Sequence, residues 1–289
     1  MEIKKFSEYE QINEGWKENL TTLIDIISSV FNEIAGINVS WWEIERYAKT
    51  MNVANSDTKI QQVIRDFKDY VRSDYRIVNK QQVYNMIDNT PIVYRKNDQV
   101  CHKLYQMVKE RSKTQSDPYC WCSTTNGGKS VIFLAKDAPY NSVFHELSHA
   151  IEPVVKVDPK ILDSFNFNYT NKQTKFLFEL ITDNKYSIKS DITKDKNYLS
   201  DPSEVWARMN NLKMFLYKHK YLNTPTQNIS ELLLLKIITG EVFRSLNDKD
   251  QQEMMRNDFM QILVFINVRK YNNIYQFVQT KIKNNKNLK

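Results

Sequence analysis

The chain contains few of the residues that build tight turns or covalent crosslinks. Its 289 residues include 5 Gly, 7 Pro and 3 Cys. So little glycine disfavours a fold made from many β-turns, whereas the abundant Lys, Asn, Glu, Gln, Ile and Leu favour helices. Three cysteines are an odd number and too few for a disulfide scaffold, which is typical of a reducing compartment. These totals predict a mainly helical globular protein.

Long apolar runs are also missing. The two longest, ELLLLKIITG and MQILVFINV, are well short of the ~20 residues that a membrane-spanning helix needs. The first twenty residues contain neither the apolar core nor the small-residue cleavage site of a secretory signal. We therefore expect a cytoplasmic protein that has no membrane partner.

The excess of positive charge is modest. The chain has 41 Lys+Arg against 34 Asp+Glu, a net charge of +7, and four of the lysines lie in the last nine residues, KIKNNKNLK. A terminal segment of this kind is usually solvated and frayed. Since no motif of interleaved aromatic and basic residues accompanies the charge, nucleic acid is not an expected partner.

The arrangement of apolar residues divides the chain into three regions. Helical spacing recurs at residues 17–35, 41–51, 58–71 and 99–111, which predicts a helical N-terminal region over residues 1–112. This region offers a surface for a protein partner. Helical patterns also fill residues 221–289, the predicted C-terminal region.

Between these helical regions, residues 113–220 have a different pattern. Two β-runs, residues 119–125 and 129–135, are joined by Asn126-Gly127-Gly128, and asparagine and glycine tolerate the positive φ of a hairpin turn. Residues 155–197 are poorly patterned and are interpreted as a segment inserted into this middle region. The sequence thus predicts an α+β fold, mainly helical, with one small antiparallel sheet.

The hairpin leads into the sequence His145-Glu146-Leu147-Ser148-His149. A helix capped by Asn141 or Ser142 and ending near Ile151 would place the two histidines one turn apart on the same face, where both imidazoles can bind one ion. Glu146 lies next to them and can take a proton from a metal-bound water. The other faces carry apolar residues that would bury the helix, namely Val143, Phe144, Leu147 and Ala150.

This His-Glu-x-x-His sequence after a hairpin resembles the zincins, a superfamily of zinc metallopeptidases, and the resemblance covers residues 119–153. It implies a zinc cofactor and a polypeptide substrate that pairs with the strand before the helix, here residues 130–135. The metzincin pattern, with Gly at position 152 and His at position 155, is excluded because those residues are Glu152 and Val155.

The stretch YLSDPSEVWARM is similar to the second helix of gluzincins, which implies that Glu204 is the third zinc ligand. Arg208, one turn later on the same face, can hold Glu204 or a neighbouring carboxylate in place. Glu152 and Glu179 are the alternatives for the third ligand. Asp201 followed by Pro202 also predicts a helix start at which Glu204 would serve only as a capping residue. Zincins often add a tyrosine that stabilises the developing oxyanion, and Tyr198 is the candidate for this role.

Two functions follow from this resemblance. The first is a gluzincin-like peptidase in which His145, His149 and Glu204 bind zinc and Glu146 is the general base. The alternative is a catalytically silent zincin-fold structural or assembly protein, because the composition and YLSDPSEVWARM also resemble phage-encoded metallopeptidase-like proteins. That alternative implies a virion component.

Overall fold

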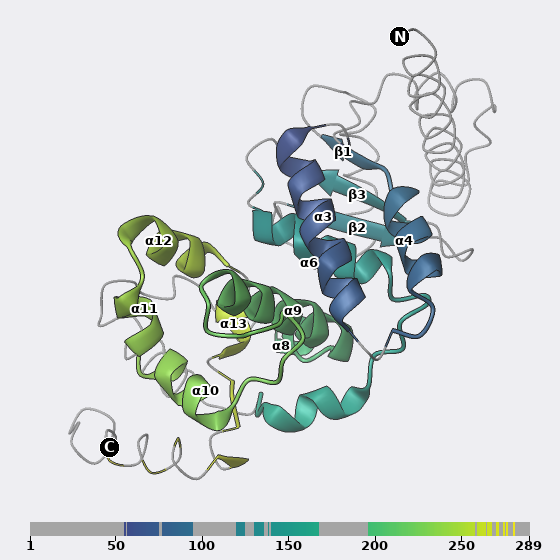
Figure 1. The fold of residues 1–289 in the computed structure, drawn as a ribbon. Coiled ribbons are helices and arrows are strands. Elements are labelled where there is room, and N and C mark those ends of the chain that lie inside the picture. Colours follow the sequence, from purple (N-terminus) through teal and green to yellow (C-terminus); the bar gives the residue numbers. More distant parts are fainter. Residues whose placement is uncertain are drawn as a thin grey trace, which may run out of the picture. The chain divides into compact units, whose positions relative to one another are not determined.

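The structure is a computed structural model of the chain, which folds into two compact units, Met1–Lys156 and Val157–Lys289. Its elements are mainly helices, with one small sheet in the first unit (Figure 1). No helix within the described ranges is both long enough and apolar enough to cross a bilayer. The structure describes residues 55, 57–74, 77–94, 120–124, 130–135, 138, 140–167, 196–257, 259–263, 265–267, 270, 271, 274, 276 and 280. The helices predicted at 17–35, 41–51 and 99–111 lie outside these residues.

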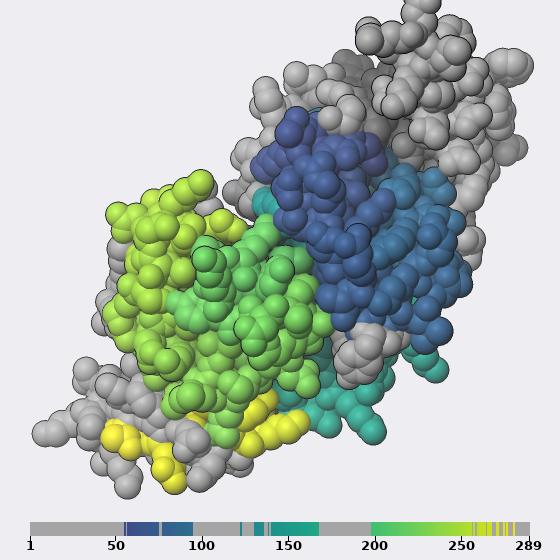
Figure 2. All heavy atoms as spheres, viewed as in Figure 1, coloured from purple at the N-terminus to yellow at the C-terminus, as the bar shows by residue number. Residues whose placement is uncertain are grey.

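Helix α3 (Thr58–Ser73) confirms the helix predicted at residues 58–71. Asp57 caps its first turn by accepting a hydrogen bond from the backbone N–H of Lys59. Apolar residues at helical spacing form its buried face, whereas Arg65 and Asp69 are exposed. A second helix, α4 (Lys80–Asp88), packs against α3. The outer faces of α3 and α4, in purple and blue, lie at the surface of this unit (Figure 2).

The sheet contains three strands: β1 (Ile92–Tyr94), β2 (Cys120–Thr124) and β3 (Ser130–Leu134). The predicted hairpin is confirmed, since β2 and β3 pair in antiparallel register with Cys122 opposite Ile132. The prediction of a wholly antiparallel sheet is wrong, because β1 pairs with β3 in parallel. A three-residue strand is too short to give a period-two pattern, so the sequence did not indicate β1.

The strand order is β1-β3-β2, which makes β3 the central strand (Figure 1). All five of its residues are buried. The expectation that residues 130–135 form the edge at which a peptide pairs is therefore wrong: β3 has a neighbour on each side. Among the described strands, β1 and β2 are the two edges, and β2 is the edge strand that belongs to the hairpin.

Helix α6 (Tyr140–Ala150) carries the His-Glu-x-x-His sequence and packs against β2, β3 and α3. It begins one residue before Asn141, which lies buried in the first turn and does not cap it. The helix ends one residue before the predicted limit at Ile151. The ring of Phe144 meets that of Phe67 edge to face, with centroids 4.8 Å apart, and this contact fixes α6 against α3.

The second unit is built from helices. They are a 3-10 helix, η1 (Pro159–Ser164), and the α-helices α8 (Lys196–Leu199), α9 (Pro202–Lys218), α10 (Glu231–Ile238), α11 (Glu241–Ser245), α12 (Asp248–Arg256) and α13 (Phe259–Leu263). Gly240, at φ 76°, makes the sharp connection from α10 to α11, a backbone conformation that favours glycine.

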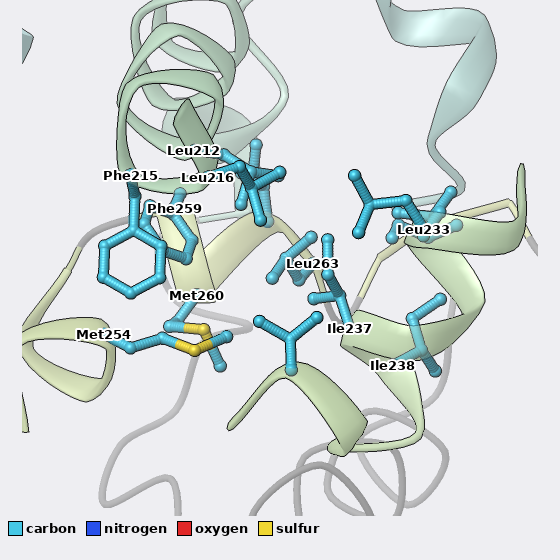
Figure 3. Packing of buried hydrophobic residues seen from close by; sticks show 14 of the residues in the cluster. Leu212, Phe215, Leu216, Leu233, Ile237, Ile238, Met254, Phe259, Met260 and Leu263 are labelled. Atoms are coloured by element: carbon cyan, nitrogen blue, oxygen red, sulfur yellow. The ribbon is translucent and has the colours of Figure 1, made fainter. Parts of the chain in front are cut away.

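The core of the second unit forms where α9, α10, α12 and α13 converge. Figure 3 shows Leu263 of α13 between Leu216 of α9 and Ile237 of α10, and Phe215 of α9 beside Phe259 of α13. The predicted middle region, residues 113–220, extends across the boundary between the two units at residue 156. Within the predicted insertion, residues 155–197, the described part contains η1 and α8.

We predict that Phe67→Ala destabilises the first unit by about 3 kcal/mol, the usual cost of removing a fully buried phenylalanine ring. Urea unfolding followed by circular dichroism would measure this loss. Val78→Ala is the control. Val78 is 95% exposed, so its replacement should change the free energy of unfolding by less than about 0.5 kcal/mol. Equal midpoints for the two variants would contradict the packing described for α3 and α6.

Candidate metal centre

The two histidines of α6 lie on one face of a firmly packed helix. The four apolar residues expected to bury the helix, Val143, Phe144, Leu147 and Ala150, are all fully buried. This packing fixes the rotation of α6 about its axis and so determines where the imidazoles lie. His145 is 4% exposed, and the side chain of His149 is 13% exposed.

The imidazoles point their Nε2 atoms at each other. These two atoms are 2.9 Å apart, and the ring planes cross at 70°. Two neutral imidazoles cannot both direct a lone pair into this space unless a proton or a cation lies between them. Two nitrogens bound to one tetrahedral zinc at about 2.0–2.1 Å are separated by about 3.3 Å. A small opening of the pair would therefore accommodate the ion.

Glu146 is attached to the neighbouring strand. Its Oε2 accepts a hydrogen bond of 2.8 Å from the backbone N–H of Cys122, at the middle of β2. In the antiparallel pairing Cys122 lies opposite Ile132, whose own N–H donates to Pro91 on the other side of β3. The N–H of Cys122 thus points to the outer edge of β2, and the carboxylate of Glu146 reaches that edge.

Glu204 lies in the first turn of α9, in the second unit. Asp201 caps this helix by accepting from the N–H of Ser203, as the sequence predicted. A reciprocal capping box would also need Glu204 to accept from the N–H of Asp201, but that N–H donates to the carbonyl of Tyr198 at 3.2 Å. Capping therefore does not account for the position of the Glu204 side chain.

Arg208 contacts Glu204, as the spacing of four residues on one helix predicted. Its Nη1 is 2.5 Å from Oε2 of Glu204 and also donates to the Glu204 carbonyl at 3.1 Å. Both residues are buried, at 9% and 3% exposure for Glu204 and Arg208. The ring of Tyr198 lies against the guanidinium, 5.1 Å from its carbon, and Tyr198 is 49% exposed. The oxyanion role of Tyr198 remains a prediction.

The first unit brings the ring nitrogens of His145 and His149 together, and Glu204 of the second unit stays the predicted third ligand. Two imidazole nitrogens and one carboxylate oxygen are ligands that several divalent metals accept. The alternative ligand Glu152 contacts Nδ1 of His149, on the opposite side of the ring from Nε2. The other alternative, Glu179, lies outside the described residues.

Two contacts of the centre were not predicted. One is the hydrogen bond between Glu146 and the N–H of Cys122, which depends on how α6 lies against β2. The other is the contact between His149 and Glu152. The spacing of three residues was a signal for the second contact, but Glu152 lies in the turn after α6, where helix geometry no longer sets its position.

Comparisons of the chain with family models, with curated proteins and with solved structures found no match.

We predict that Arg208→Ala lowers the free energy of unfolding of the second unit by about 3 kcal/mol or more in metal-free protein. The physical reason is that the carboxylate of Glu204 would remain buried without its cation. Urea unfolding measures the change, and Lys249→Ala is the control on the exposed surface of α12. If both variants unfold at the same urea concentration, the pair does not stabilise α9 as described.

Proposed function

We propose that the protein is a zinc-dependent peptidase of gluzincin type, in which His145, His149 and Glu204 hold the metal. The observation that carries the proposal is the pair of Nε2 atoms facing each other at 2.9 Å, on the helix that also carries Glu146. A buried, packed helix that directs two imidazoles at one point favours metal binding over two isolated hydrogen-bonded histidines.

The donor set fits a catalytic zinc ion. Structural zinc sites usually have four protein ligands, whereas catalytic sites have three and leave a position for water or substrate. Two histidines and one glutamate are a set of the second kind. When bound, zinc polarises a carbonyl group and lowers the pKa of water, so that water attacks near neutral pH.

Each remaining residue has a distinct task in this proposal. Glu146 accepts the proton of the attacking water and passes it to the leaving amine. The N–H of Cys122 fixes one oxygen of that carboxylate, which limits the directions in which Glu146 can move. Arg208 holds the carboxylate of Glu204 in one orientation through their short contact. Tyr198 would donate its hydroxyl proton to the developing oxyanion.

We propose that the substrate is a polypeptide lying in extended form along β2. An edge strand has backbone groups on its outer side that can pair with another chain. The outward N–H of Cys122 identifies this side of β2, and it is the side that the carboxylate of Glu146 reaches. A peptide bound there would bring a scissile bond next to the general base.

Metal content tests the proposed ligands. We expect the purified protein to bind about one zinc ion per chain. His145→Ala should lose the zinc, because the two remaining ligands are too few to hold it. Elemental analysis after dialysis measures the zinc. His219→Gln is the matched control: His219 pairs with Asp250 at 3.7 Å and is not one of the proposed ligands. Zinc retained in His145→Ala would refute the proposed ligand set.

Hydrolysis tests the proposed role of Glu146. We expect Glu146→Gln to reduce cleavage of a fluorescently labelled, unfolded polypeptide by about 100-fold or more, since an amide cannot accept the proton. The zinc content and the urea midpoint should remain close to those of the unchanged protein. Glu241→Gln, an exposed glutamate on α11, should cleave normally.

The outcome also distinguishes the alternative function. A protein that binds zinc but cleaves nothing in a broad peptide mixture, with Glu146→Gln indistinguishable from it, would be a silent zincin-fold assembly protein. Cleavage that survives in Glu146→Gln would instead show that another residue is the general base.

A further inference from the structure

Glu152 makes a close contact with the second histidine. Its Oε1 lies 2.5 Å from Nδ1 of His149, and the two residues are three positions apart. Glu152 lies in the turn that follows α6, where its N–H donates to the carbonyl of His149 at 3.2 Å. The backbone of this turn therefore folds back on the last turn of the helix and brings the carboxylate to the ring.

This position is an unfavourable one for a carboxylate. The C-terminal end of a helix carries partial negative charge, and an anion there costs about 0.3–1 kcal/mol. The Glu152 side chain is 30% exposed, so burial does not force it toward the ring, and it would be better solvated pointing outward. The hydrogen bond to His149 offsets this cost.

The contact determines which nitrogen of His149 carries the proton. An ionised carboxylate only accepts hydrogen bonds, so Nδ1 must be the donor. In the neutral imidazole Nε2 then has the lone pair, and it is Nε2 that faces His145 at 2.9 Å. The same hydrogen bond restrains rotation of the imidazole ring about its Cβ–Cγ bond. The tautomer and the ring orientation are those that a metal ligand requires.

We propose that Glu152 is a positioning residue: it fixes the Nδ1–H tautomer and the ring orientation of His149 so that Nε2 is presented to the metal. This inference rests on the proposed function. It assigns Glu152 a role different from that of a third ligand, because Glu152 contacts the nitrogen that does not face the metal.

The test uses Glu152→Ala and Glu152→Gln in the full chain. Zinc affinity is measured by competition with a chelating dye, and the ligand field by the visible absorption of the Co²⁺-loaded protein. We expect Glu152→Ala to bind zinc about 10- to 100-fold more weakly, with a changed Co²⁺ spectrum. Glu152→Gln should recover part of the affinity, because its amide oxygen can still accept from Nδ1. Asp69→Asn, which removes an exposed carboxylate on α3, should change neither.

A second readout needs no metal. Nitrogen-15 shifts of the histidine rings in metal-free protein, recorded at about pH 8 where an ordinary imidazole is neutral, report the tautomer directly. We expect His149 to be protonated on Nδ1 in the unchanged protein and to become a mixture of tautomers in Glu152→Ala. If Glu152→Ala does not fold, Glu152→Leu decides, because leucine fills similar space but has no hydrogen-bond acceptor: zinc affinity and ring shifts identical to those of the unchanged protein would overturn the inference.

These readouts separate the two proposals. Protein that binds no zinc but has the Nδ1–H tautomer at His149 would refute the peptidase and leave the positioning by Glu152 intact. Protein that binds zinc equally well with and without the Glu152 carboxylate would refute the positioning role and leave the proposed metal ligands intact.

Discussion

Burial of one side of α6 is the constraint on which the candidate centre depends. Val143, Phe144, Leu147 and Ala150 are fully buried, and Phe144 meets Phe67 of α3 edge to face. Because these contacts fix the helix in rotation, the two histidines need little reorganisation to face each other. A pair of imidazoles on a loosely packed helix would lose conformational entropy on binding a metal, and that loss would weaken the affinity. Here the entropy cost of ordering the helix is met when the first unit folds.

Charge is balanced locally around each of the three acidic residues of interest. Glu204 is paired with Arg208, Glu146 accepts from a backbone N–H of β2, and Glu152 accepts from the ring of His149. None of these partners competes for the facing Nε2 atoms of the imidazoles. Buried or half-buried carboxylates that are held in this way keep fixed positions, which is what both ligation and proton transfer need.

The small sheet controls which strand can accept another chain. Pairing of β1 with β3 covers the side of β3 that the hairpin leaves open, so an extended ligand has no access to β3 through its backbone groups. The described part of the sheet has two edges, β1 and β2, and the carboxylate of Glu146 is bonded to the β2 edge. Because β1 pairs with β3, the strand proposed for docking is β2 and not β3.

Local features of the centre were predictable from the sequence. The spacing of His145 and His149, the cap at Asp201, the pairing of Arg208 with Glu204 and the hairpin all depend on residues only a few positions apart, where helix and turn geometry leave little choice. Only the tertiary structure placed β1 beside β3, Glu146 on the N–H of Cys122 and the Glu152 carboxylate on His149. The first two join segments more than twenty residues apart, so they depend on which packing of helix and sheet buries the most apolar surface. The third depends on the turn that follows α6, whose path the helical pattern does not set.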